Sequence, residues 1–259
     1  MSQYIFDDHP DAREFRRLQL IERAMDPAST ALLEQTGLAA GQSCLEIGAG
    51  AGSLVDWMAG RVGSGGRVFA LDKKAVHLRR FIDPPVQVIE GGLQDLALDR
   101  PVDLAHARYV FIHNSNAGAL LRHVRTLLNR GAYFVVEEPD FTCAARLQPN
   151  PKAAVDRVNG AIEKMFLDAG LDPAYGLRLP QEVRDAGFDL LCTDSRLHLA
   201  PGGAPIAEVM AESALALRAA YRKTGLATDA EIDQYVARAR DPRVWAVYYA
   251  TVAVLARAV

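Results

Sequence analysis

Two carboxylates and a set of glycines are the residues in this sequence whose types and spacing suit chemistry. Glu46 lies inside a short apolar run, residues 43–47. Three glycines follow at every second position: Gly48, Gly50 and Gly52. A buried carboxylate is costly unless a cation or a hydrogen-bond donor meets it. A glycine turn presents backbone N–H groups to a polar ligand at the start of a helix. The pattern predicts a strand, a turn and a helix that hold a polar ligand with a cationic group.

The second carboxylate, Asp72, ends another apolar run, residues 68–71. In dinucleotide-binding folds an acid roughly 20 residues after the glycine turn hydrogen-bonds a ribose. We therefore expect Asp72 to accept hydrogen bonds from two ribose hydroxyls, with Lys73 along the ribose edge. The alternative is an exposed aspartate at a strand end.

Residues 45–52, Leu-Glu-Ile-Gly-Ala-Gly-Ala-Gly, resemble motif I of the class I S-adenosylmethionine (SAM)-dependent methyltransferases, whose pattern is hydrophobic-Asp/Glu-x-Gly-x-Gly-x-Gly. The resemblance implies that SAM is the cofactor and that Asp72 grips its ribose. It also implies that the motif supplies five cofactor-binding residues: Glu46, Gly48, Ala49, Gly50 and Gly52.

Three further stretches bear on the cofactor. Tyr4 and residues 14–18 resemble an arm of small-molecule methyltransferases whose Tyr and Arg close over the SAM carboxylate, which implies this role for Tyr4 and Arg17. The alternative is a solvated surface helix. Residues 103–113 resemble the family stretch Asp-Leu-Val-His-Ala-Arg-x-x-x-x-His, which implies that backbone carbonyls at Ala107 or Arg108 face the SAM amino group. The family has an acid against adenine where this chain has Gly92, so Leu93 N–H and Gln94 are the candidate adenine contacts.

Two residues are candidates for acid–base catalysis. The fourth expected strand starts at Val102 and runs to Asn114, so His113 lies near its end. A histidine pKa of about 6.5 suits a general base. Glu138 lies in the stretch Glu-Glu-Pro-Asp-Phe, residues 137–141, which also resembles the family. It could deprotonate or orient an acceptor, as could Asp140. A packing histidine and solvated loop carboxylates are the alternatives, and His106, inside a strand, is expected to be structural.

Strands alternating with helices predict an α/β fold, and the resemblance implies a Rossmann-like, seven-stranded, mostly parallel sheet with helices on both faces. We expect an N-terminal helical arm (1–38), a SAM-binding core (39–204), a helical lid (205–243) and a closing antiparallel strand (244–259). The lid is expected to contain two helices within residues 205–240. Asp26 and Pro27 are expected to start a second helix within the arm. Thr228 and Glu231 are expected to form a capping box within the lid.

Composition limits the partners. The net charge is −3 and no Lys/Arg-rich run occurs, so nucleic acid is not an expected partner. The three cysteines follow no metal spacing, no metal site is expected, and reduced thiols are typical of a cytoplasmic protein. No apolar stretch is long enough for a membrane span. The arm is a possible homo-oligomer contact, because Tyr4 could reach a neighbouring subunit.

The sequence therefore predicts an enzyme, a methyltransferase that moves the methyl group of SAM to an O, N or C atom of a small organic acceptor in biosynthesis, of the kind found in secondary metabolism. One alternative is a SAM-binding regulator or cyclase that uses the cofactor without methyl transfer. An NAD(P)-dependent reductase fits less well, because the third small residue of Gly-x-Gly-x-x-Gly would fall on Ser53.

Overall fold

The computed structural model describes residues 11–150 and 152–259, and within them the chain forms one seven-stranded sheet with the order β3-β2-β1-β4-β5-β7-β6. In chain order the strands are β1 Ser43–Ile47, β2 Arg67–Asp72, β3 Val86–Glu90, β4 Val102–Arg108, β5 Leu128–Asp140, β6 Phe188–Pro201 and β7 Trp245–Ala258. Strands β1 to β5 pair in parallel, while β7 lies antiparallel between β5 and β6. The expected mostly parallel, Rossmann-like α/β fold is confirmed.

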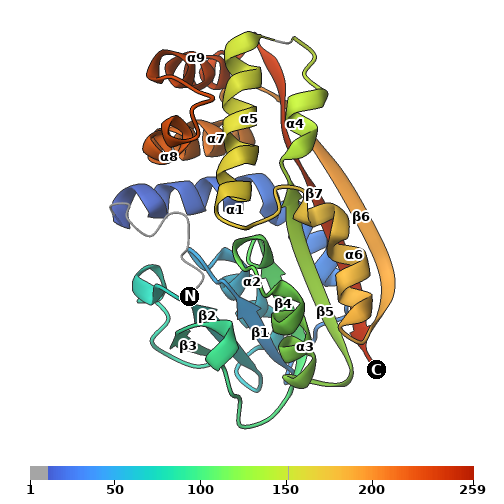
Figure 1. Ribbon diagram of the computed structural model, residues 1–259. Coiled ribbons are helices and arrows are strands. Elements are labelled where there is room, and N and C mark those ends of the chain that lie inside the picture. The colour runs from blue at the N-terminus through green and yellow to red at the C-terminus, as the bar shows by residue number, and fades with distance from the viewer. Residues whose placement is uncertain (1–10, 151) are drawn as a thin grey trace.

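Helices cover both faces of this sheet (Figure 1). The α-helices are α1 Asp11–Glu34, α2 Ser53–Val62, α3 Ala117–Thr126, α4 Thr142–Arg146, α5 Ala153–Asp168, α6 Tyr175–Asp185, α7 Pro205–Ala216, α8 Arg218–Lys223 and α9 Asp229–Arg240. Three 3-10 turns follow strand ends: η1 Ala75–Leu78, η2 Leu93–Asp95 and η3 Phe111–His113. Helices α5, α7, α8 and α9 gather at one end of the molecule, and α1 runs between them and the sheet (Figure 1).

Two hydrophobic clusters hold the sheet in place. On one face, α2 packs Val55 and Met58 against Cys44 and Val68 of β1 and β2. The larger cluster joins the other face to α3, α5, α6 and the lid helices. Burial on both faces explains why the central strands are short apolar runs.

The arm contains one continuous helix, so the expected second start at Asp26 is wrong. Pro27 lies inside α1. Met25 and Leu33, on either side of it, are both buried, so packing holds the helix together through the proline. Asp26 does not cap a helix, because its carboxylate accepts a hydrogen bond from Arg108 at 2.9 Å.

Two other boundaries differ from expectation. The lid has three helices rather than two, because the chain turns at Leu217 between α7 and α8. Strand β4 stops at Arg108 because Tyr109 adopts a φ of +60°, which no strand residue has. The expected capping box is confirmed at the start of α9: Thr228 accepts from the Glu231 N–H group, and the Glu231 side chain accepts from the Thr228 N–H group.

Candidate active site

A large cavity lies at the carboxyl ends of β1, β2, β4 and β5, with α1, α5, α7 and β7 around it. Parallel strand ends meet at one sheet edge, and open α/β sheets bind ligands there. The register places Ile47 beside both Leu71 and Ala107, so the residues that follow β1, β2 and β4 converge. The cavity has a polar end at the glycine turn and an apolar end beneath α5 and α7.

The glycine turn is shaped by its own backbone contacts. The N–H groups of Gly48 and Ala49 donate to the Leu71 carbonyl at 2.8 and 3.0 Å. Gly50 has a φ of +57°, a left-handed conformation that favours glycine. Its N–H group donates to Asp72 Oδ2 at 2.9 Å. Gly48, Ala49 and Gly50 line the cavity.

Gly52 differs from Gly48, Ala49 and Gly50 in its surroundings. It is not among the cavity-lining residues. A Cβ atom at Gly52 would lie 2.7 Å from the Phe81 ring and 2.9 Å from the Arg80 guanidinium. The chain after η1 therefore packs closely against the turn at Gly52.

The polar end of the cavity also contains four more of the predicted residues. Asp72, Lys73, Leu93 and Gln94 all line it. Asp72 accepts hydrogen bonds from the N–H groups of Gly50 and Lys74, while burial raises the pKa of its carboxyl. The carboxylate thus lies where β2 ends, between the glycine turn and the start of η1.

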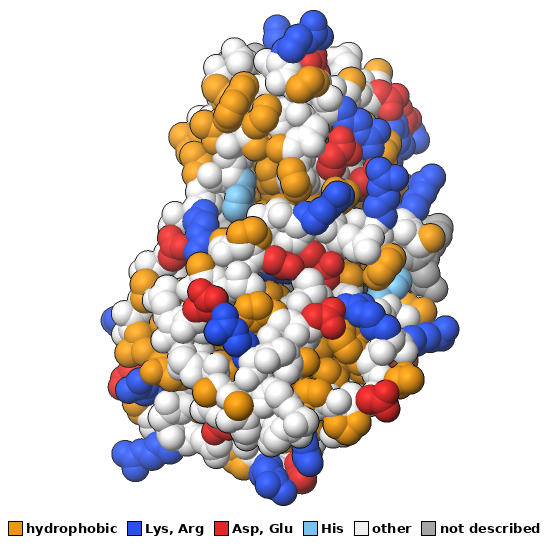
Figure 2. Space-filling model, turned by 180° about the vertical axis from the view of Figure 1, so that it is seen from behind, with side chains coloured by type: hydrophobic (Ala, Val, Ile, Leu, Met, Phe, Trp, Pro, Cys, Tyr) orange, Lys and Arg blue, Asp and Glu red, His pale blue; other side chains and the backbone are white. Residues whose placement is uncertain are grey.

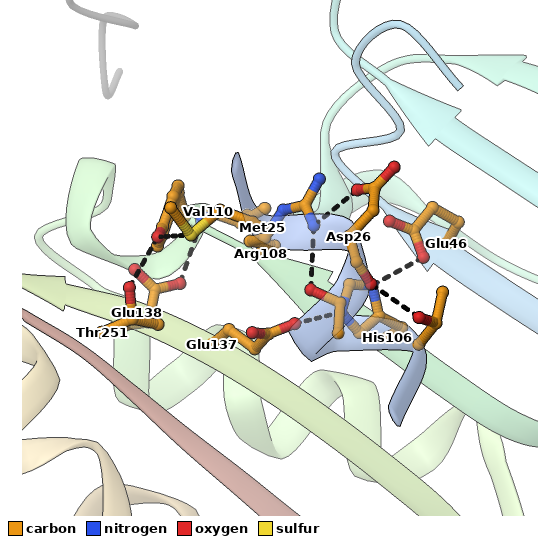
Figure 3. Close-up of polar contacts among 12 residues, drawn as sticks. Met25, Asp26, Glu46, His106, Arg108, Val110, Glu137, Glu138 and Thr251 are labelled. Atoms are coloured by element: carbon orange, nitrogen blue, oxygen red, sulfur yellow. Dashed lines mark hydrogen bonds and ion pairs between the residues drawn. The ribbon is translucent and has the colours of Figure 1, made fainter. Parts of the chain in front are cut away.

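Glu46 is part of a buried line of charges (Figure 3). His106 Nδ1 lies 2.7 Å from Glu46 Oε2, and His106 Nε2 lies 3.1 Å from Glu137 Oε1. All three side chains are at most 3% exposed. Glu46 and His106 are opposite each other in the β1–β4 register, so their side chains share one face of the sheet.

The charges of this line follow from its contacts. Burial alone would lower the pKa of His106, but the Glu46 carboxylate and a hydrogen bond to Glu137 raise it to about 9. Burial raises the pKa of Glu46, whereas the hydrogen bond from His106 and the charge of Arg108 outweigh burial and lower the pKa of Glu137. An imidazolium between two buried carboxylates is the arrangement that satisfies these groups.

Arg108 extends the line to the arm. Its guanidinium donates to Asp26 Oδ1 at 2.9 Å and to the Ser29 hydroxyl at 2.8 Å, so β4 is tied to α1. Arg108 and Arg17 both line the cavity, and Arg17 pairs with Glu14 at 2.6 Å. Ala107 is fully buried in β4 and is not among the lining residues. Tyr4 lies outside the described residues.

His113 lies in the cavity wall, but its environment limits it as a base. Its ring stacks near Phe166, with centroids 6.3 Å apart. Burial, with Arg17 and Lys73 nearby, lowers the pKa of His113 to about 3. The imidazole is therefore neutral at physiological pH and a weak proton acceptor.

Glu138 is neither a solvated loop carboxylate nor a cavity-lining group. It is fully buried, and its carboxylate accepts hydrogen bonds from the N–H groups of Val110, Phe111 and Ile112 at 2.7–3.1 Å. Burial raises the pKa of Glu138 to about 8 against the effect of these donors. Its position supports the η3 turn that carries His113. Asp140 similarly accepts from the N–H and hydroxyl groups of Thr142.

The apolar end contains residues that sequence reasoning missed. Phe141 stacks on Phe166 with centroids 5.3 Å apart, and Tyr249 of β7 lies 5.3 Å from Phe141. Met165, Met210 and Leu217 complete this wall from the helical layer. The aromatic cluster of β7 thus contributes to the cavity through Tyr249, although its composition alone indicates only a core strand.

A chain of hydroxyl groups runs beside Tyr249. Tyr109 is the one non-glycine residue with a positive φ in the described part of the chain. Its hydroxyl lies 2.6 Å from Thr251 Oγ1, which lies 2.7 Å from His198 Nε2. Burial and Arg196 lower the pKa of His198 to about 4, so its neutral ring can accept a hydrogen bond from Thr251. No sequence signal joins these residues, because Tyr109 follows β4 while His198 and Thr251 come from β6 and β7.

Among the described residues no group of three or more His, Cys, Asp or Glu side chains is placed to hold a metal ion. A search of the same residues for a helix long and apolar enough to cross a membrane finds none.

A Rossmann-like sheet with a glycine turn between Glu46 and Asp72 defines the class of the SAM-binding α/β proteins. Comparison with known protein families identifies the family to which the chain belongs. A family described as "Methyltransferase domain" matches residues 13–193, which is most of the chain. The chain belongs to this methyltransferase family, and the resemblance of its sequence to class I SAM-dependent methyltransferases is confirmed. SAM is the cofactor of this class.

The similar proteins agree in fold and differ in chemistry. A cyclopropane synthase, MmaA2 of Mycobacterium tuberculosis, has a TM-score of 0.62 and 15% identity, with 99% of each chain covered. The [4+2]-cyclase SpnF has a TM-score of 0.57 and 18% identity over 90% of this chain and 80% of its own. A phosphoethanolamine N-methyltransferase 2 of Haemonchus contortus has a TM-score of 0.59 and 14% identity over 97% of this chain and 59% of its own.

A curated relative is similar in sequence. It is an uncharacterized 37.1 kDa protein in transposon TN4556 of Streptomyces fradiae, 27% identical over 154 residues. The match covers 57% of this chain and 44% of the relative, so the chain spans less than half the length of that protein.

Proposed function

We propose that this protein transfers the methyl group of SAM to a small, partly apolar organic acceptor. The observation that carries the proposal is the single cavity that joins a carboxylate-flanked glycine turn to an aromatic chamber. A cofactor at the first end and an acceptor at the second would share one space, which is the condition for direct transfer between them.

The donor set at the polar end fits SAM. The sulfonium and ammonium groups of SAM are cationic, and its ribose offers two hydroxyls. Glu46 supplies a carboxylate for the cationic groups, and Asp72 supplies one for the ribose. Ala49 and Gly50 present a turn without bulky side chains, and Leu93 and Gln94 lie where the nucleobase would extend. Arg17 and Arg108 line the same end and suit the SAM carboxylate. When bound, the cofactor supplies an electrophilic methyl group.

The chain's contribution at the apolar end is positioning and exclusion of water. Phe141, Phe166 and Tyr249 form a nearly continuous aromatic wall. Because burial raises the pKa of Tyr249 to about 12, its hydroxyl stays protonated and can donate a hydrogen bond to an acceptor oxygen or nitrogen. The neutral ring of His113, which stacks near Phe166, can also orient the acceptor.

A small acceptor is also supported by the surface. Basic and acidic side chains are intermixed on the face shown in Figure 2, without a basic tract that would follow a polyanion. The apolar end of the cavity is lined by side chains of α5, α7 and β7. Both features favour a compact organic acceptor, as in biosynthesis of small metabolites.

A second candidate function is a SAM-dependent cyclase or related enzyme without methyl transfer. It is favoured by one observation: His113 is a weak base and Glu138 lies outside the cavity wall, so the predicted acid–base pair is not assembled there. Release of S-adenosylhomocysteine with acceptor turnover supports methyl transfer; acceptor conversion without its release supports the second candidate.

Calorimetric titration tests the proposed cofactor. Wild-type protein is titrated with SAM, NADH and NADPH, beside Asp72→Ala and the control Asp83→Ala, which removes an exposed aspartate. Loss of a charged hydrogen-bond acceptor costs about 1.5–3 kcal/mol, so Asp72→Ala should weaken SAM binding roughly 10- to 100-fold. Asp83→Ala should bind SAM as wild type does. Tight binding of NADH or NADPH in place of SAM would overturn the proposal.

A further inference from the structure

Strand β6 is an edge strand of the sheet. β6 is hydrogen-bonded to β7 along one edge, and no described strand pairs with the other. It runs over 14 residues on the outside of the molecule (Figure 1). A long edge strand presents unpaired N–H and C=O groups, which another strand can use for pairing.

The middle of β6 is regular and carries an unusual pattern of side chains. Register shifts occur only between Leu190 and Cys192 and between Leu197 and Leu199, so residues 192–197 pair with β7 without interruption. In that segment Thr193, Ser195 and Leu197 are exposed and uncharged. Asp194 and Arg196, on the opposite face, are half-buried and form an ion pair with each other.

This pattern is self-complementary. If a second β6 strand lies antiparallel to the first with the two-fold axis at Ser195, Asp194 of each copy is opposite Arg196 of the other. Thr193 is then opposite Leu197 on the uncharged face. Leu191 and Leu199, 49% and 48% exposed, flank the segment at equal distances from Ser195. An isologous contact needs this property, since each residue meets its symmetric counterpart.

We propose that β6 is a homodimer interface, in which two copies pair edge to edge about Ser195 into one continuous sheet. The occupant is a second copy rather than another protein, because the charges that flank Ser195 complement themselves under the two-fold axis. The contact would cover the exposed leucines of the strand and satisfy its open backbone edge. It does not depend on the proposed function.

Sedimentation velocity tests the charge pairing. Wild-type protein at micromolar concentrations is expected to sediment with twice the mass of one chain. Asp194→Arg or Arg196→Asp alone places like charges opposite each other and should give a monomer. The double variant Asp194→Arg/Arg196→Asp exchanges the signs and should restore the dimer. Circular dichroism of all three variants shows whether each is folded.

Engineered cysteines test the register. In a background with Cys192→Ser, Ser195→Cys places two thiols at directly opposite positions, where Cα atoms are about 4.5–5.5 Å apart. That separation suits a disulfide, so oxidation should give a crosslinked dimer. Thr193→Cys is the matched control: its two copies would be four residues apart along the strands, about 13 Å, and should not crosslink.

Three outcomes would overturn the proposal. The first is a wild-type monomer throughout the concentration range. The second is a dimer that persists in both single charge variants with no crosslink at Ser195→Cys, because the contact then lies elsewhere. The third is open-ended polymer, which would indicate that β6 pairs with a different edge of the next molecule.

Discussion

His106 lies between two buried carboxylates and forms a hydrogen bond with each of them. Glu46 on β1 and Glu137 on β5 each face one nitrogen of its ring (Figure 3). Removing one member of such a buried set leaves uncompensated charge and costs about 3–5 kcal/mol. His106→Gln should therefore lower the free energy of unfolding by about 3 kcal/mol, measured by urea denaturation near neutral pH.

The same residue makes stability depend on pH. The folded-state pKa of His106, about 9, lies above the value of 6.5 in the unfolded chain, so the folded state holds the proton more tightly. Its contribution is complete below about pH 6.5 and is lost as the pH rises through 9. The urea midpoint of wild type should fall across this window, and that of His106→Gln should fall less.

A matched control is His123→Gln on α3, which leaves the buried pair of carboxylates with its histidine. It should keep the wild-type pH dependence between pH 6.5 and 9. Equal slopes in wild type and His106→Gln would show that this histidine is neutral in the folded protein.

For single residues, the sequence predicted which side chains need a partner better than it predicted which residue that partner is. Glu46 was expected to need a cation or donor, and it has one in His106. The sequence could not identify that partner, because the pair depends on the register of β1 against β4. Glu137 was missed for the same reason. The sequence made its neighbour Glu138 a candidate catalytic group but could not show that its carboxylate accepts hydrogen bonds from three backbone N–H groups.

The turn after β4 is an element held by one side chain. Three successive N–H groups of η3 and its preceding residue donate to Glu138. Glu138→Ala leaves these buried donors without an acceptor, and each such group costs about 1–3 kcal/mol. We expect at least about 3 kcal/mol of destabilisation by urea unfolding and weaker SAM binding by calorimetry, because Val110 and His113 line the cavity.

Glu138→Gln provides the graded comparison. It keeps one acceptor oxygen in nearly the same volume, so both its stability and its SAM affinity should lie between those of wild type and Glu138→Ala. A wild-type unfolding free energy in Glu138→Ala would contradict the supporting role and return Glu138 to the list of candidate catalytic groups.

Helices and strands with a regular sequence pattern were predictable from the sequence, whereas those with an irregular residue inside or at one end were not. Strands β1 to β3 and the capping box of α9 follow from apolar runs and local signals. The proline signal at Pro27 was outweighed by packing of Met25 and Leu33 on either side. The end of β4 was missed because Tyr109 adopts a left-handed conformation that its residue type disfavours.

The whole molecule is built so that distant parts of the chain close one cavity. The sheet supplies the glycine turn and Asp72, α1 covers them, and α7 and β7 from the last quarter of the chain supply the far wall. The sequence indicated the glycine turn through motif I, because the residues of that motif are consecutive in the chain and form the turn themselves. The far wall was less predictable. An apolar residue on a lid helix gives the same sequence pattern whether it faces the core or a ligand.

A ligand that fills this cavity should stabilise the whole fold. SAM at about 100 times its dissociation constant adds roughly 2.7 kcal/mol to the free energy of unfolding. For a chain of this size that corresponds to a rise in Tm of about 5–10 °C. Asp72→Ala should show about half of that rise or less at the same concentration, and NADPH should give none. Thr228→Ala, which removes the α9 capping box far from the cofactor end, should lower Tm by itself yet keep the full rise with SAM. A rise with SAM that is undiminished in Asp72→Ala would place the cofactor away from β2 and contradict the site.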